Sequence, residues 1–97
     1  MGLDNCRLFF SGAAPISDKI VTFFAGLDIQ IYNIYGMSEC TGPMTISYPN
    51  CFKIGSCGKK VEGTELKIAE DTGEICTRGR HVMMGYLNLP DKTRKTI

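Results

Sequence analysis

Ile29-Gln30-Ile31-Tyr32-Asn33-Ile34-Tyr35-Gly36-Met37-Ser38-Glu39 carries the strongest structural signal in this chain of 97 residues. Its first part, Ile29–Ile34, is an apolar run typical of a buried strand. Its second part, Tyr35–Glu39, places an aromatic ring, a flexible glycine, a hydroxyl and a carboxylate where that strand would end at the protein surface. Ligands of open α/β sheets bind beyond the carboxyl ends of the strands. These five residues therefore indicate either a binding turn for a planar base, a phosphoryl oxygen and a metal, or an ordinary turn with a solvent-exposed Glu39.

An earlier strand and a helix complete a unit with this run. Arg7–Phe10 is a short strand candidate that leads into the small-residue loop Ser11–Pro15. Ser17 is placed to cap a helix whose apolar side chains recur at helical spacing, namely Ile20, Phe23, Phe24 and Leu27. Strand, helix and strand with short joints predict a βαβ unit with a right-handed crossover. Because both strands then end at one sheet edge, the loop at 11–15 and the turn at 35–39 should lie side by side.

The rest of the chain is richer in strand signals. Thr45–Tyr48 is a brief strand candidate, and Thr64–Ala69 and Glu74–Gly79 both alternate polar with apolar residues. The last two segments flank a turn and therefore predict an antiparallel hairpin. Pro90 suits the first position of a further helix.

The predicted fold class is therefore α/β. Residues 1–43 form the βαβ unit of a parallel sheet with its ligand loops, and residues 44–97 form a β-rich hairpin region. A parallel sheet is normally covered by helices on both faces, which these elements cannot provide. The organisation is that of a part of a larger domain.

Composition excludes several classes of protein. The chain is 43% hydrophobic and 22% charged, with a net charge of +1, so it lacks the excess of basic residues that is typical of proteins that bind nucleic acid. No apolar run is long enough to span a membrane, and no secretory signal is evident. The five cysteines lack a Cys-x-x-Cys pair, which favours reduced, buried or half-buried thiols in a cytosol-facing protein. A nucleophilic pair between a cysteine and His81 stays open as an alternative.

The candidate site residues suit a nucleotide. Gly12, Ala13 and Ala14 leave little side chain between the backbone and a flat ring, although a packed turn has the same composition. Tyr35 could stack on the other face of such a ring or pack in the core. Glu39 offers an oxygen ligand for magnesium, which proteins usually hold through one or two carboxylates plus substrate phosphates. The spacing of the glycine-rich segment Gly55–Lys59 is wrong for a Walker loop.

Several motifs in this chain, taken in order, resemble those of the adenylate-forming, or AMP-binding, enzymes. They are Leu8–Ile16, Tyr35–Pro43, Gly73–His81 and Gly85–Asn88. Together they are most similar to the long-chain acyl-CoA synthetases of the bubblegum type. In that family a fatty acid attacks the α-phosphate of ATP, and coenzyme A then displaces AMP to give the acyl thioester. The resemblance implies a long-chain fatty acid–CoA ligase that uses ATP, Mg²⁺ and coenzyme A.

The resemblance also implies a role for each matching residue. Residues of the first loop would line the adenine pocket, namely Gly12, Ala13, Ala14 and Pro15. Tyr35 would stack on adenine, and Gly36 and Met37 would shape the turn. Ser38, where many relatives have Thr, would bind the α-phosphate, and Glu39 would hold magnesium. Ser38 and Glu39 are thus the catalytic candidates. Weaker parts of the likeness place Gly42, Pro43 and the loop at 55–58 beside the acyl pocket.

Some family features have no counterpart in this sequence. They are the phosphate loop, the aspartate that binds the ribose and the C-terminal domain with its lysine. The chain is therefore expected to be an internal fragment of the large N-terminal domain, with little or no ligase activity alone. One alternative is a non-catalytic product that retains a nucleotide half-site or pairs with a full-length homologue. Another is a relative that activates aryl or short-chain acids. The family implies a cytoplasmic location or a peripheral one at the endoplasmic reticulum membrane.

Overall fold

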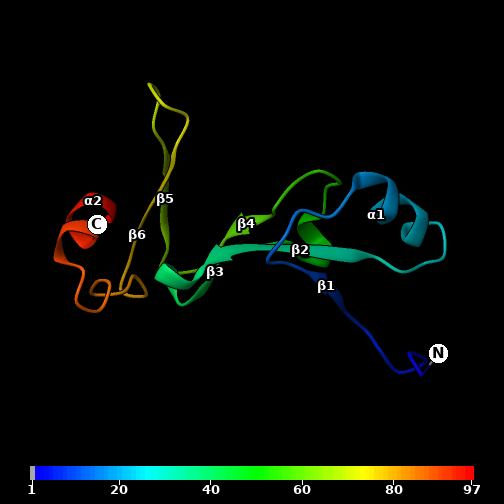
Figure 1. Ribbon diagram of the computed structural model, residues 1–97. Coiled ribbons are helices and arrows are strands. Elements are labelled where there is room, and N and C mark those ends of the chain that lie inside the picture. The colour runs from blue at the N-terminus through cyan, green and yellow to red at the C-terminus, as the bar shows by residue number, and fades with distance from the viewer. Residues whose placement is uncertain (1) are drawn as a thin grey trace.

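The computed structural model describes residues 2–97, which form a four-stranded mixed sheet, a separate two-stranded hairpin and four short helices (Figure 1). In chain order the elements are β1 (Phe9–Ser11), α1 (Asp18–Ala25), β2 (Ile31–Met37), the 3-10 helix η1 (Ser38–Cys40), β3 (Gly42–Ile46), the 3-10 helix η2 (Pro49–Cys51), β4 (Lys59–Lys60), β5 (Glu65–Ile68), β6 (Ile75–Arg78) and α2 (Pro90–Thr96). The predicted α/β class is confirmed.

The first three elements form the predicted strand–helix–strand unit. β1 and β2 pair in parallel, with Phe9 opposite Ile31 and Ser11 opposite Asn33. β1 begins two residues later than the sequence predicts and includes Ser11. Because the two strands run in the same direction, the loop after Ser11 begins at the same edge of the sheet at which β2 ends.

Helix α1 begins where expected but buries a different face. Ser17 has the extended backbone of an N-cap, although its side chain makes no capping hydrogen bond. The buried residue of the helix is Val21, at 2% exposure, and Phe24 is half-buried. Phe23 and Leu27, from the predicted apolar stripe, are 65% and 57% exposed. Most of the apolar side chains at helical spacing therefore lie at the surface, because apolar spacing does not reveal which side a neighbouring element covers.

Strand β2 extends farther than the sequence indicates. Tyr35, Gly36 and Met37 belong to the strand, and the chain turns only in η1. β3 then returns antiparallel, with a register shift between Tyr35 and Gly36. The expected turn at 35–39 is thus corrected to a strand end followed by a 3-10 helix. The strand expected at 45–48 begins earlier, at Gly42, because pairing with this longer β2 orders it.

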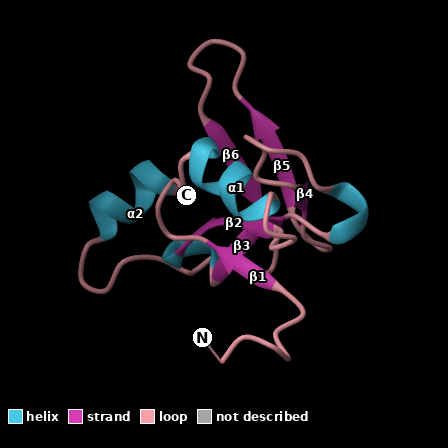
Figure 2. Cartoon of the chain, turned by 90° about the vertical axis from the view of Figure 1, so that its right-hand side faces the viewer, coloured by secondary structure: helices cyan, strands magenta, loops and turns pink. Residues whose placement is uncertain are grey.

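The predicted hairpin is present as β5 and β6, with Glu65 opposite Arg78 and Ile68 opposite Ile75. Both ribbon views show it rising away from the four-stranded sheet (Figures 1 and 2). Its apolar residues Ile68 and Ile75 are 67% and 43% exposed. The helix expected at Pro90 is also present, with the proline in its first turn.

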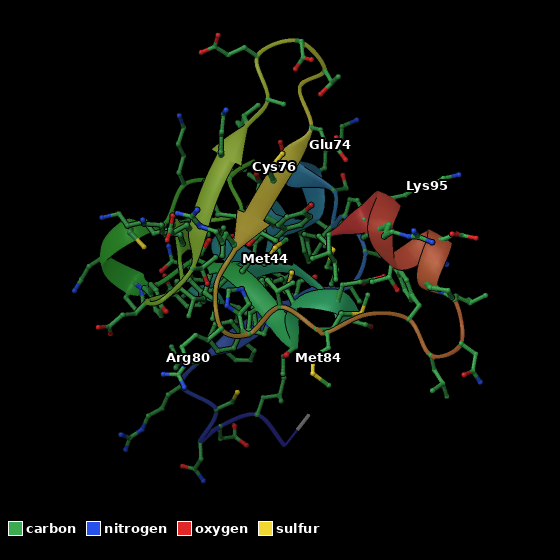
Figure 3. The ribbon with its side chains drawn as sticks, turned by 90° about the vertical axis from the view of Figure 1, so that its left-hand side faces the viewer. Met44, Glu74, Cys76, Arg80, Met84 and Lys95 are labelled. Atoms are coloured by element: carbon green, nitrogen blue, oxygen red, sulfur yellow. The ribbon has the colours of Figure 1, made fainter. Side chains whose placement is uncertain are left out.

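The core is small and lies under β2 and β3. Met44 on β3 is fully buried and lies in the middle of the molecule, whereas Met84 projects outward (Figure 3). The ring of Tyr32 packs on Phe10 and Phe52, at centroid distances of 5.8 Å and 5.7 Å. The molecule is elongated, with extents of 48 × 31 × 23 Å. Within residues 2–97, no helix has the length and apolarity needed to cross a bilayer.

Candidate functional site

A cleft of about 280 Å³ opens where β1 and β2 end. One wall is the loop after β1, and the other is the end of β2. The lining residues from the loop are Ser11, Ala13, Ala14, Pro15 and Ile16, and those from β2 are Asn33, Ile34, Tyr35 and Gly36. The structure therefore brings together two segments that the sequence analysis expected to meet at one sheet edge.

The loop wall lies close to the neighbouring strand. A Cβ atom on Gly12 would lie 3.1 Å from the carbonyl oxygen of Ile34, so this position has little room for a side chain. Ala13 follows in the left-handed region, with φ of 68°. That conformation costs a non-glycine residue on the order of 1 kcal/mol. The loop thus presents backbone and methyl groups to the cleft.

Tyr35 lies between two cavities. It lines the cleft and also a second cavity of about 360 Å³. The second cavity is mostly apolar and separates the sheet from the hairpin, where its lining includes Leu66, Ile68 and Ile75. Cys57 also lines both cavities. The half-buried ring of Tyr35 is thus a wall that a ligand could contact from either side.

The predicted site residues fall into two groups. Ala13, Ala14, Pro15, Tyr35 and Gly36 line the cleft, and Gly12 lies beside it against Ile34. Met37, Ser38 and Glu39 lie past the cleft lining, at the end of β2 and in η1. The site is therefore extended along the sheet edge, with small and aromatic groups at one end and the hydroxyl and carboxylate at the other.

Sequence reasoning did not predict four of the residues that line the cleft, namely Ile16, Asp18, Asn33 and Ile34. Gly55 and Cys57 also line it, although the resemblance placed their loop beside the acyl pocket. Asn33 donates a hydrogen bond from Nδ2 to the carbonyl oxygen of Ser56 at 3.1 Å and so attaches the glycine-rich loop to β2. Its signal in the sequence was a polar side chain inside an apolar run. The partner could not be identified, because it lies 23 positions away.

The glycine-rich loop is fixed to the sheet at a second point. Thr45 Oγ1 donates to the carbonyl oxygen of Cys57 at 2.7 Å, and the amide of Gly58 donates to Ser56 Oγ at 3.1 Å. This loop therefore forms a fixed side of the cleft.

Glu39 is held by a segment from the C-terminal part of the chain. The hydroxyl of Tyr86 donates to Glu39 Oε1 at 2.6 Å, and the amide of Met83 donates to the carbonyl oxygen of Glu39 at 2.7 Å. Lys92 Nζ lies 4.3 Å from the centroid of the Tyr86 ring. Three interactions lower the pKa of Glu39 and outweigh the effect of its partial burial. They are the hydrogen bond from Tyr86, the hydrogen bond from the Glu39 backbone amide and the positive charge of Lys92. The hydrogen bond between Tyr86 and Glu39 also raises the pKa of Tyr86.

The residues around Glu39 suit a metal held mainly by a nucleotide. Tyr86 occupies Oε1, and no side chain among the described residues donates a hydrogen bond to Oε2. Within residues 2–97 there is no group of three or more His, Cys, Asp and Glu side chains that could bind a metal by themselves. One carboxylate with a free oxygen is the donor set expected when phosphates supply the remaining ligands of Mg²⁺.

The five cysteines are all free thiols. Cys40 is buried and Cys51 is half-buried, but Cys6, Cys57 and Cys76 are exposed. The expectation that all would be at least half-buried was wrong for these three, because the strand and loops that carry them lie at the surface. Burial raises the pKa of Cys40, and the nearby Glu39 charge raises it further. No cysteine forms a hydrogen bond with His81 within residues 2–97, so the alternative of a Cys–His pair gains no support.

Comparison with known proteins defines the class to which this fold and cleft belong. The chain belongs to the AMP-binding enzyme family, whose match extends over residues 2–87. It is 48% identical, over 101 aligned positions, to the long-chain-fatty-acid–CoA ligase ACSBG2 of Gallus gallus. The alignment covers 100% of this chain and 13% of that protein. The identity is also 48% with the long-chain-fatty-acid–CoA ligase heimdall of Drosophila melanogaster, of which the alignment covers 15%.

A solved structure shows the same arrangement. The o-succinylbenzoate CoA synthetase MenE of Bacillus subtilis, bound to a product analogue, matches with a TM-score of 0.84 and 25% identity. The match covers 94% of this chain and 21% of that protein. The resemblance to AMP-binding enzymes and to the bubblegum-type ligases is thus confirmed. The chain spans only about 13–15% of the length of these curated relatives.

Proposed function

We propose that this chain is part of the large N-terminal domain of a long-chain fatty acid–CoA ligase and supplies the nucleotide side of its active site. Residues 1–43 would be the βαβ unit with the nucleotide loops, and residues 44–97 its β-rich continuation. The substrates would be a long-chain fatty acid, ATP and coenzyme A. The 48% identity to two such ligases over the whole chain supports this substrate class.

One observation carries the proposal. Ala13, Ala14 and Pro15 line the same cleft as Tyr35 and Gly36, although the two segments are far apart in the sequence. In the proposal, adenine lies between the flat wall formed by Ala13 and Ala14 and the ring of Tyr35. Stacking of a base on an aromatic ring contributes about 1–3 kcal/mol to binding. Gly12 allows the loop to lie close to β2, and Gly36 and Met37 set the direction in which the chain leaves the cleft.

Ser38 and Glu39 would act on the phosphates. The Ser38 hydroxyl is exposed and would donate a hydrogen bond to an α-phosphate oxygen. Glu39 would hold Mg²⁺ through Oε2, because Oε1 already accepts from Tyr86. A bound Mg²⁺ supplies positive charge that stabilises the developing negative charge on the phosphates. The two side chains would thereby orient the α-phosphate toward the attacking carboxylate, which forms the acyl-adenylate as the bond to the departing pyrophosphate breaks.

The activity is proposed for the ligase architecture as a whole. This chain spans 13% of the length of its Gallus gallus relative, so the acyl and coenzyme A sites would involve further protein. We expect little or no acyl-CoA formation by the 97 residues alone. By family likeness, the ligase would work in the cytoplasm or at the surface of the endoplasmic reticulum membrane.

Titration of the purified chain with a hydrolysis-resistant acyl-adenylate analogue tests the proposal. Saturable binding that is lost in Tyr35→Ala and in Glu39→Ala would support a retained nucleotide half-site. Tyr48→Ala is the matched control, because Tyr48 is exposed and does not line the cleft. Equal binding by wild type and all three variants would contradict the proposed site, as would no binding at all.

A second candidate function is pairing with another copy or with a full-length homologue. The observation that favours it is an exposed apolar surface formed by α1 and the turn after it, where Ile20, Phe23 and Leu27 are 47%, 65% and 57% exposed. Light scattering of the purified chain, alone and mixed with a full-length homologue, tests this function. A complex that Phe23→Asp disrupts would support it, and a monomeric chain in both samples at all concentrations would contradict it.

A further inference from the structure

The contact between Tyr86 and Glu39 joins two parts of the chain that are 47 positions apart. The hydrogen bond from the Tyr86 hydroxyl to Glu39 Oε1 is 2.6 Å long and partly buried. A hydrogen bond to an ionised carboxylate is shorter and roughly twice as strong as one between neutral groups. Among the described residues, this bond is the only side-chain contact that holds the carboxylate of Glu39 in one direction.

The segment that delivers Tyr86 is itself fixed to η1. Thr41 Oγ1 donates to the carbonyl oxygen of His81 at 2.7 Å, and the Met83 amide donates to that of Glu39 at 2.7 Å. Three hydrogen bonds therefore attach residues 81–86 to Glu39 and Thr41, and the bond from the Tyr86 hydroxyl is the last of them along the chain.

Tyr86 is held from the other side by α2. Its amide donates to Thr93 Oγ1 at 2.9 Å, and Thr93 Oγ1 donates to the carbonyl oxygen of Leu89 at 3.0 Å. Lys92 lies over the face of the Tyr86 ring, where a cation is attracted to the aromatic π-system. Thr93 therefore holds the backbone of Tyr86 and Lys92 lies against its ring, so the hydroxyl that reaches Glu39 belongs to a side chain with a fixed position.

The chemical nature of the donor matters for a metal ligand. Tyr86 is neutral and donates one proton, so Glu39 keeps its negative charge and Oε2 stays without a side-chain donor among the described residues. A lysine or arginine in the same place would neutralise the carboxylate and oppose a second cation. Carboxylates that bind metals are commonly held in this way by hydrogen bonds from groups that do not touch the metal.

We propose that Tyr86 is a positioning residue for the metal site, and that its hydroxyl fixes Glu39 Oε1 so that Oε2 is free to bind a divalent cation carried by a nucleotide. The inference rests on the proposed function, since it concerns the cation that this function assigns to Glu39. Tyr86 would touch neither the cation nor the nucleotide.

The test measures binding of the Mn²⁺–ATP complex to the whole chain, by the enhancement of water-proton relaxation that occurs when the complex tumbles with the protein. The variant Tyr86→Phe removes only the hydroxyl and keeps the ring beneath Lys92. Tyr48→Phe is the matched control, because no described residue forms a hydrogen bond with the Tyr48 hydroxyl. AMP binding in the presence of a chelator is measured in parallel, since it does not depend on the cation.

In Tyr86→Phe, Mn²⁺ affinity should fall by about tenfold, the usual cost of losing a group that holds a metal ligand. AMP affinity and the control variant should be unchanged. Unchanged or tighter Mn²⁺ binding in Tyr86→Phe would overturn the inference while leaving the proposed function intact. Equal losses of Mn²⁺ and AMP affinity would also overturn it, because a merely structural role affects both. No Mn²⁺ binding by the wild-type chain would overturn both the inference and the assignment of the cation to Glu39.

If Tyr86→Phe does not fold, Thr93→Val provides a second variant. It removes the acceptor of the Tyr86 amide and keeps the Tyr86 hydroxyl. A selective loss of Mn²⁺ affinity, smaller than the one expected for Tyr86→Phe, supports the inference. An unchanged Mn²⁺ affinity overturns it.

Discussion

Gly36 and Gly42 lie backbone to backbone across the β2–β3 pair, so closely that a Cβ atom on Gly36 would lie 1.9 Å from the carbonyl oxygen of Gly42. That oxygen belongs to a paired strand and cannot move aside without breaking the register. The close approach occurs next to the register shift between Tyr35 and Gly36. This close contact therefore fixes the path of the backbone from Tyr35, which lines the cleft, to the segment that contains Glu39.

Gly36→Ala is expected to destabilise the chain by about 3 kcal/mol, at the upper end of the usual cost of overpacking. Thermal and urea unfolding measure the effect. Gly63→Ala is the control, because a Cβ there meets nothing within 4 Å and only the positive φ of 80° is unfavourable. The control should lose roughly 1–2 kcal/mol. A Gly36→Ala variant as stable as the control would show that β2 and β3 do not approach each other this closely.

Asn33→Ala should lower the free energy of unfolding by about 1 kcal/mol, the usual contribution of one hydrogen bond. It removes the bond to the Ser56 carbonyl that attaches the glycine-rich loop to β2. Asn50→Ala is matched to it, since Asn50 is exposed and its side chain forms no hydrogen bond with a described residue. Amide exchange at residues 55–58 should become faster in Asn33→Ala only. Equal exchange in both variants would mean that this attachment is unimportant.

The pH dependence of Glu39 follows from its hydrogen bond with Tyr86. This bond lowers the pKa of Glu39 below the ordinary value of 4.5. A carboxylate with a lowered pKa stabilises the folded state above the pKa of the unfolded chain, and the contribution disappears as the pH falls through the folded value. In Tyr86→Phe the pKa of Glu39 should therefore rise toward 4.5, as measured by NMR titration of the side-chain carboxyl carbon. A pKa that does not change would show that the hydroxyl does not hold the carboxylate in solution.

The cysteines should differ in their reaction with iodoacetamide. Cys6, Cys57 and Cys76 are exposed and should react, whereas Cys40 is 3% exposed and has a raised pKa, so it should react only on unfolding. Peptide mass spectrometry follows each site separately. Bound ATP should slow the labelling of Cys57, which lines the cleft, and leave Cys6 and Cys76 unaffected. Equal slowing at all three exposed thiols would speak against binding in the cleft.

Local patterns predicted the parts of the fold that depend on neighbouring residues. The parallel strand–helix–strand unit, the hairpin around residues 71–73 and the start of α2 at Pro90 all follow from apolar spacing and turn residues. The same patterns brought Ala13 and Tyr35 to one sheet edge, because parallel strands joined by a crossover must end on the same side.

Contacts between distant segments could not be predicted in this way. The extension of β2 through Gly36 depends on backbone contact with Gly42, which hydropathy does not record. The burial of Val21 rather than Phe23 depends on which side of α1 the sheet covers. The bond between Glu39 and Tyr86 joins positions 47 apart, and nothing in the local sequence of either residue indicates the other.

NMR of the labelled chain with bound ATP shows whether a purine base lies in the cleft between Ala13 and Tyr35, as we propose. Nuclear Overhauser effects should connect the adenine H2 and H8 protons with both the Ala13 methyl group and the Tyr35 ring. Contacts of the adenine protons with the hairpin residues Leu66 and Ile75 in place of Ala13 would rule out this position of the base, and so would a spectrum that ATP does not change.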